Sequence, residues 1–167
     1  MPTGKFRYER GPFSRQETDE WARAIEQAHP DCSSMEDRAA QLIVDCLRQS
    51  SDCILCFDGQ AVVGAILYGW DDRGSCINLY SLAVLVSHRR QGIGSSLLEK
   101  VMDKARGRVP ILTASCVLPR AQGILTRTGF WTVKNYLGHT LYKWSDVADH
   151  QNKKALGDDW EWTEFPG

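Results

Sequence analysis

Hydrophobic positions along the chain change from strand spacing to helical spacing most clearly between residues 81 and 106. Residues 81–86 are an apolar run typical of a strand, and a polar turn containing Gly92 and Gly94 follows. Beyond the glycines, apolar residues recur every three to four positions, which places them on one face of a helix. The pattern predicts a strand, a glycine turn and a buried helix with inward residues Ile93, Leu97, Leu98, Val101, Met102 and Ala105.

Two helices are predicted in the first third of the chain, after a weakly alternating strand at residues 5–9. Ser14 can cap the first helix, with Glu17 as the partner in a capping box, and His29-Pro30 ends it. The second helix is capped by a serine at position 33 or 34 and ends near position 47. The predicted inward residues are Trp21, Ala22, Ile25, Ala28, Ala39, Leu42, Ile43 and Cys46.

The other segments have strand patterns separated by turn signals. Strands at 52–57 and 61–70 are joined across Asp58-Gly59-Gln60, a strong hairpin signal. The strand that leads into the glycine turn covers 75–86. A strand at 110–116, a short helix at 119–128 and a hairpin of strands 130–136 and 139–144 complete the chain. Strands and helices are therefore mixed, and the predicted class is α/β (α+β).

Length and composition indicate one ordinary globular domain. The chain has 167 residues, of which 43% are hydrophobic and 25% charged, with a net charge of -1. This charge gives no basic footprint for a nucleic-acid backbone, although it does not exclude such a partner. The N-terminus lacks a signal-peptide pattern, and the longest apolar run, 61–70, is too short to span a bilayer. A cytoplasmic location and no membrane partner are expected.

The six cysteines fit reduced thiols in a chain of this size. Cys53 and Cys56 have the spacing of a metal half-site. However, they lie in a predicted strand, where positions i and i+3 point to opposite faces, and no second Cys or His pair is suitably spaced. Buried structural thiols and no metal are therefore expected.

The glycine turn is suited to phosphate. The first turn of a helix leaves N–H groups unpaired at the positive end of its dipole, and glycine lets an anion approach the backbone. A dinucleotide fingerprint requires a third glycine, but position 97 is Leu. A P-loop requires Lys where this chain has Ser95. A strand-to-helix turn that binds nothing is the alternative.

The segments Leu82-Ala83-Val84 and Arg89-Arg90-Gln91-Gly92-Ile93-Gly94-Ser95 resemble the acetyl-CoA signature of the GNAT N-acetyltransferase superfamily. Gly129-Phe130 stands where that family commonly has a Gly-Phe pair. The resemblance covers residues 5–144. It implies the GNAT fold, a mixed and mostly antiparallel sheet of about seven strands flanked by about four helices. We expect residues 1–144 to form the acyltransferase domain and residues 145–167 to form a tail that packs on the body or on a partner subunit.

The same resemblance implies that acetyl-CoA is the co-substrate. It places the pantetheine arm along the end of the central strand and the diphosphate on the glycine turn. The implied cofactor-binding residues are Val84, Leu85 and Val86 for pantetheine, and Arg89, Arg90, Gln91, Gly92, Ile93, Gly94 and Ser95 for the diphosphate.

Catalysis requires a group that takes the proton of the acceptor amine, since a free alkylamine has a pKa near ~10.4. Relatives often carry a carboxylate in the middle of the central strand, where this chain has Tyr80 and Ser81. Alternation places Tyr80 and Asn78 on one face, toward the expected cleft, where they could hold a water that relays the proton. The alternative is that Tyr80 only packs. Leu125 occupies the position of a tyrosine that many relatives use as general acid.

The predicted function is N-acetyl transfer from acetyl-CoA to a primary amine by direct attack in a ternary complex. The first alternative is a GNAT-fold sensor or scaffold that binds acyl-CoA without catalysis, and the second is a phosphate-binding module unrelated to CoA. Near-neutral charge favours a small-molecule acceptor over protein or nucleic acid. A homodimer is compatible with the expected tail.

Overall fold

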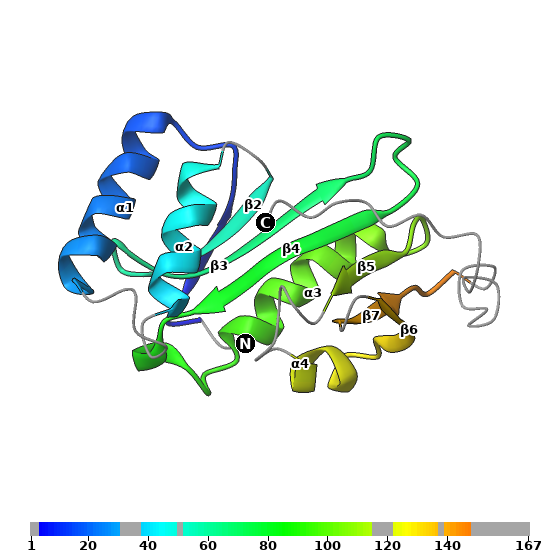
Figure 1. Cartoon of the computed structure of the whole chain (residues 1–167). Helices are drawn as coiled ribbons and strands as arrows, with labels where there is room; N and C mark the ends of the chain where they lie inside the picture. Colours follow the sequence, from blue (N-terminus) through cyan, green and yellow to red (C-terminus); the bar gives the residue numbers. More distant parts are fainter. Residues whose placement is uncertain (1–3, 31–37, 50–51, 115–121, 137–138, 148–167) are drawn as a thin grey trace. The chain divides into compact units, whose positions relative to one another are not determined.

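The computed structural model describes residues 4–30, 38–49, 52–114, 122–136 and 139–147. Within these ranges the strands form one mixed sheet in the order β1-β2-β3-β4-β5-β7-β6 (Figure 1). The pair β4–β5 is parallel, whereas β1–β2, β2–β3, β5–β7 and β6–β7 are antiparallel. The predicted mixed, mostly antiparallel sheet is confirmed. The elements are β1 Arg7–Arg10, α1 Arg15–Ala28, α2 Arg38–Arg48, β2 Cys53–Asp58, β3 Ala61–Trp70, β4 Ile77–Val84, the 3-10 helix η1 Val86–His88, α3 Ile93–Ala105, β5 Ile111–Ala114, α4 Gln122–Arg127, β6 Trp131–Tyr136 and β7 His139–Trp144.

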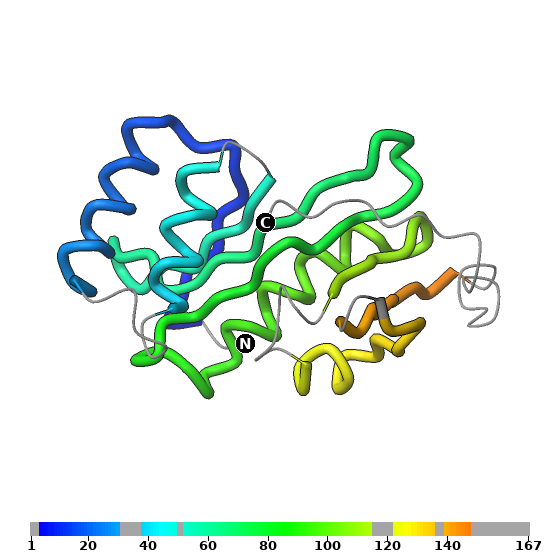
Figure 2. Tube along the Cα trace, viewed as in Figure 1, coloured from blue at the N-terminus to red at the C-terminus, as the bar shows by residue number. Residues whose placement is uncertain are grey.

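The central strand is shorter than predicted. Residues 75–86 were expected as strand, but β4 starts at Ile77 and η1 follows it. At the start, the Asp71 carboxylate accepts hydrogen bonds from the backbone N–H of Ser75 and, at 3.2 Å, of Cys76, so these residues belong to the β3–β4 turn. Figure 2 shows the chain reversing direction there. The predicted cap at 33 or 34 and the start of the helix at 119 lie outside the described residues.

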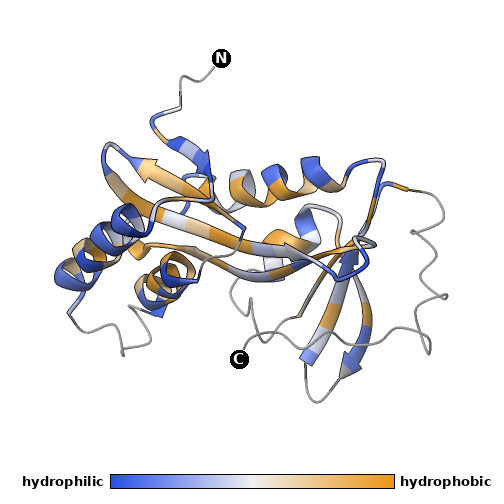
Figure 3. Cartoon of the chain, turned by 90° about the horizontal axis from the view of Figure 1, so that it is seen from above, coloured by the Kyte–Doolittle hydropathy of each residue, from blue (hydrophilic) through white to orange (hydrophobic). Residues whose placement is uncertain are grey.

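The chain divides into two compact units that are described separately: Met1–Leu67 with Ser81–Leu98, and Tyr68–Tyr80 with Glu99–Gly167. In the first unit α1 begins as predicted, because the Ser14 hydroxyl accepts the N–H of Glu17 at 3.2 Å. Ala22 and Ile25 are buried, but Ala28 is exposed, so its predicted inward position is wrong. A helical stripe predicts which side faces the core, not how far along the helix the core extends. The hydropathy colours of Figure 3 show that α1 is built mostly of hydrophilic residues.

Helix α3 packs closely on the sheet in this first unit. A Cβ added at Gly64 of β3 would lie 3.0 Å from Cγ2 of Ile93 and 3.4 Å from Cδ1 of Leu97. Glycine at position 64 therefore lets the helix approach the strand. The six residues predicted to form the inward stripe of this helix are all buried, which confirms that prediction.

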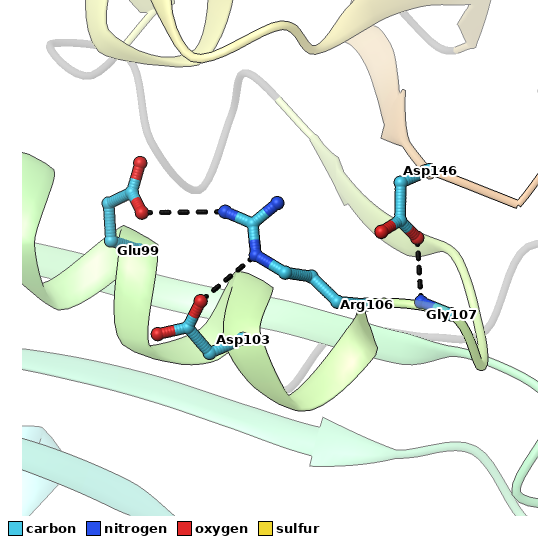
Figure 4. A network of polar contacts seen from close by, with 5 residues as sticks. All are labelled: Glu99, Asp103, Arg106, Gly107 and Asp146. Carbon is cyan, nitrogen blue, oxygen red and sulfur yellow. Dashed lines mark hydrogen bonds and ion pairs between the residues drawn. The ribbon is translucent and has the colours of Figure 1, made fainter.

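In the second unit, β7 pairs with both β5 and β6, and Thr113 of β5 donates its hydroxyl proton to the carbonyl of Leu79 at 3.3 Å. The end of α3 is held by the polar network in Figure 4. Arg106 bonds Asp103 at 3.0 Å and Glu99 at 3.5 Å, and the N–H of Gly107 donates to Asp146 at 2.8 Å. These contacts connect the end of α3 to the segment that follows β7.

The four cysteines among the described residues, Cys46, Cys53, Cys56 and Cys76, are free and buried. Burial raises the pKa of the Cys46 thiol to about 12 and that of the Cys53 thiol to about 11, so both are protonated at neutral pH. The described residues include no cluster of metal-ligating side chains. No helix among them is long and apolar enough to cross a membrane.

Candidate functional site

The turn between β4 and α3 has the backbone geometry of an anion-binding site. Arg90 has φ 63° and Gly92 has φ 80°, both in the left-handed region. Helix α3 begins immediately afterwards, and its first helical hydrogen bond runs from the N–H of Ser96 to the carbonyl of Gly92 at 3.0 Å. The preceding N–H groups of the helix have no acceptor within it. They are donors to which a phosphate can bind.

The surroundings of Gly92 fit such a ligand. A Cβ added at this position would have nothing within 4 Å, so the space next to the backbone is open. A side chain would fill that space and would also have to adopt a positive φ, which costs roughly 1–2 kcal/mol. Arg90 and Gln91 are exposed beside it, whereas Gly94 is buried in the first turn of α3. Glycine at 92 is thus required by conformation as well as by access.

Arg89 has a structural contact in addition to its predicted role. Its Nε donates to the carbonyl of Val84 at 3.3 Å, which ties the turn to the end of β4. Arg90, by contrast, has an exposed side chain and lies in the strained backbone position. Of the two arginines predicted to bind the diphosphate, Arg89 is therefore bonded to the end of β4, whereas Arg90 extends into solvent.

The end of β4 is only partly free to pair with a ligand. The N–H of Leu85 donates to the carbonyl of Val63 on β3 at 2.9 Å, and Leu85 is buried. Val86 is 51% exposed and is the large hydrophobic residue most open to solvent among those described. Val84 is half-buried. Of the three residues predicted for the pantetheine arm, Val84 and Val86 remain accessible.

The predicted catalytic residues lie on the part of β4 that belongs to the second unit. Asn78 is only 2% exposed, and its side-chain oxygen is 3.9 Å from the Cys76 sulfur. Tyr80 is half-buried. Its ring lies over Gly69 of β3, because a Cβ added there would come 2.9 Å from Cε2 of Tyr80. Tyr80 is thus partly accessible, whereas Asn78 is enclosed.

Two further residues of the second unit bear on the chemistry. Leu125 of α4, at the position of the expected tyrosine, is fully buried and is a core residue. Lys143 of β7 is 4% exposed and pairs with Leu112, the neighbour of Asn78 in the parallel ladder. Burial lowers the pKa of the Lys143 ammonium, with a smaller opposite effect from Cys76.

Sequence reasoning missed three residues that shape the site. Gly69 could have been noticed as a glycine inside a strand pattern, which often marks a close approach of another group. Asp58 was read only as a turn residue and His88 was not interpreted. Their contact is 2.9 Å and joins positions 30 residues apart, which no local pattern indicates.

Comparison with known proteins agrees with this geometry. The model of the acetyltransferase (GNAT) family matches residues 14–130. No curated protein matches the chain significantly. Among solved structures, aminoglycoside 6'-acetyltransferase type Ii is 16% identical in sequence; the match covers 83% of this chain and 97% of the other, with TM-score 0.58. The catalytic domain of Tetrahymena GCN5 histone acetyltransferase in complex with coenzyme A is 18% identical; the match covers 90% of this chain and 99% of the other, with TM-score 0.55. A GNAT acetyltransferase from Brucella melitensis in complex with acetyl-CoA is 18% identical, covering 84% and 89%, with TM-score 0.53.

The strand, glycine turn and helix thus define an acetyltransferase fold. The chain belongs to the acetyltransferase (GNAT) family and is an acyltransferase of that type. The Tetrahymena structure contains coenzyme A, and the Brucella melitensis structure contains acetyl-CoA. The predicted family, fold and enzyme class are confirmed.

Proposed function

We propose that this protein transfers an acetyl group from acetyl-CoA to a primary amine by direct attack in a ternary complex. The observation that carries the proposal is the open turn at Gly92, where a positive φ and the start of α3 present backbone N–H groups. The family match supports the donor, because coenzyme A carries a diphosphate of the kind that such a turn binds.

On the donor side, Gly92, Ile93, Gly94 and Ser95 would hold the diphosphate through their backbone, and Arg90 would add charge. Val84 and Val86 would pair with the pantetheine amides, since the N–H of Leu85 is already used within the sheet. The exposed side chain of Val86 would pack on the arm. Acetyl-CoA supplies the thioester carbonyl that the amine attacks, and the sulfur leaves as a thiolate.

On the acceptor side, Tyr80 is the residue we propose to relay the proton of the amine through a water. A thiol pKa near ~8.5 makes the thiolate a fair leaving group without a dedicated acid, so the buried Leu125 is compatible with turnover. Asn78, which is 2% exposed, would then not meet the substrate directly. A small-molecule amine remains the favoured acceptor, and cytoplasmic location remains an expectation from the sequence.

A non-catalytic acyl-CoA sensor is the second candidate. Three observations favour it: β4 carries no carboxylate, Asn78 is 2% exposed, and Leu125 is fully buried. The sensor would bind the thioester through the same turn but would lack any group that takes a proton.

Two measurements test these candidates. Calorimetry with acetyl-CoA, repeated with excess ATP, is expected to show binding that ATP does not displace; absence of binding, or equal competition, would reject the donor assignment. Release of free thiol is then followed with a panel of amines, amino acids and peptides. Amine-dependent release supports the transferase, and binding without release across the panel supports the sensor.

A further inference from the structure

We propose that Asp58 and His88 form a positioning pair that holds the donor-binding turn in its binding-competent shape. The inference rests on the proposed donor site. Asp58 is the last residue of β2, and His88 ends the 3-10 helix η1. The Nε2 atom of His88 lies 2.9 Å from Oδ2 of Asp58, and their side chains are 20% and 34% exposed. The pair joins the β2–β3 hairpin to the segment just before the turn.

The hydrogen-bond pattern defines the arrangement of the ring. A carboxylate only accepts, so Nε2 of His88 carries a proton toward Asp58. The other ring nitrogen, Nδ1, lies 2.7 Å from the Ser87 hydroxyl oxygen. It accepts the hydroxyl proton in the neutral imidazole and donates to that oxygen in the imidazolium. Both contacts are therefore retained in either charge state of His88.

The Asp58 side of the pair is anchored in the sheet. Asp58 pairs with Ala61 across a two-residue hairpin turn in which Gly59 has φ 62°. The carbonyl of Gly59 accepts a hydrogen bond from Nη1 of Arg7 on β1 at 3.3 Å. The backbone of Asp58 is therefore held by two paired strands, from which its carboxylate reaches His88.

The His88 side leads directly into the strained turn. The ring packs edge-on against Phe6, with centroids 6.1 Å apart, and Nζ of Lys5 lies 5.4 Å from the centroid of the Phe6 ring. The backbone N–H of His88 donates to the carbonyl of Leu85 at 2.9 Å. Arg90, two residues later, has a positive φ that a non-glycine residue keeps only when its surroundings impose it.

The consequence concerns donor affinity rather than chemistry. Without the pair, the segment from Ser87 to Gly92 can leave the conformation that presents the amides of α3. Binding of acetyl-CoA must then also order the turn, and this ordering cost weakens the measured affinity. Asp58 and His88 act through the turn and need not touch the ligand.

A double-mutant cycle on coenzyme A affinity tests the pair. The dissociation constant of coenzyme A is measured by calorimetry for the wild type, Asp58→Ala, His88→Ala and the double variant, well below their unfolding temperatures. Each single change is expected to weaken binding about three- to tenfold, the range of an ordinary net hydrogen-bond contribution. The double variant is expected to bind no more weakly than the weaker-binding of the two single variants. Unchanged single variants, or effects that simply multiply, would overturn the pairing.

Two further variants separate positioning from general stability. Glu26→Ala removes a more exposed ion pair, to Arg48, between α1 and α2, and is expected to leave coenzyme A affinity unchanged. His88→Gln keeps an N–H donor for Asp58 and is expected to recover affinity to within about twofold of wild type. If His88→Gln binds as weakly as His88→Ala, the hydrogen bond is not what positions the turn.

The proposed function and this inference fail in different ways. A wild-type protein that does not bind coenzyme A rejects the donor site itself. A wild-type protein that binds coenzyme A, with unaffected Asp58 and His88 variants, rejects the positioning pair alone.

Discussion

The ring of Tyr80 lies against the backbone of Gly69. A Cβ added at Gly69 would come 2.9 Å from Cε2 of Tyr80 and 3.2 Å from its hydroxyl oxygen. Both distances are shorter than ordinary van der Waals contacts. The Tyr80 ring can therefore take this position only because residue 69 of β3 is a glycine. The orientation of the Tyr80 phenol, which is half-buried, thus depends on Gly69 of the neighbouring strand β3.

Replacing Tyr80 with Phe tests its role in proton transfer, because the change keeps the ring and removes the hydroxyl. We expect turnover to fall by ~10- to 100-fold with coenzyme A affinity unchanged, the usual range for one acid-base group. Steady-state kinetics with an accepted amine, together with calorimetry, provide the two values. Wild-type turnover in the folded variant would remove Tyr80 from the mechanism and leave bulk water as the base.

Replacing Gly69 with Ala tests whether the position of the Tyr80 hydroxyl matters. The added methyl group must displace the ring, so turnover should fall about as far as in Tyr80→Phe, while overpacking costs roughly 1–3 kcal/mol of stability. In the Tyr80→Phe background the same change should have little further effect on turnover. An equal loss in both backgrounds would mean that Gly69 acts through stability or through another residue.

Gly92→Ala tests the donor turn, with Gly74→Ala as a matched control. Both glycines have positive φ values, 80° and 65°, and both would place a Cβ in open space. Each change should therefore cost a similar ~1–2 kcal/mol of folding stability. Only Gly92→Ala is expected to weaken coenzyme A binding, by at least tenfold in calorimetry. Equal affinities in the two variants would contradict the assignment of the diphosphate to this turn.

The sequence alone predicted the elements and the arrangement of strand, glycine turn and helix, because these depend on local patterns. The stripe from Ile93 to Ala105, the cap at Ser14 and the Asp58-Gly59 turn each follow from residues a few positions apart, and each is confirmed. The ends of β4 were not predictable in this way. Its start depends on the Asp71 side chain, which reaches Cys76 across the β3–β4 turn.

The burial of the proposed catalytic residues Asn78 and Tyr80 could not be predicted from the sequence, for a different reason. Alternation predicted one face for Asn78 and Tyr80, but not that one is enclosed and the other half-exposed. Those differences depend on which strands are neighbours and in what register, and periodicity within one strand does not define its partner. The contact of Asp58 with His88 has the same origin.

Lys143 is the last test, and it concerns the pH dependence of folding. The side chain is 4% exposed, and burial lowers the pKa of its ammonium below the usual ~10.4 of a free lysine. The unfolded chain therefore binds this proton more tightly than the folded protein. Lys143 reduces stability most below its folded pKa, and this cost disappears as pH rises toward ~10.4.

Lys143→Met should raise the free energy of unfolding at pH 7 by about 1 kcal/mol, because it replaces a buried charge with a side chain of similar volume. Urea unfolding at pH 7 and pH 10 is the measurement. The gain in Lys143→Met should shrink at pH 10; a loss of stability in Lys143→Met at pH 7 would show that the ammonium is compensated in the folded protein.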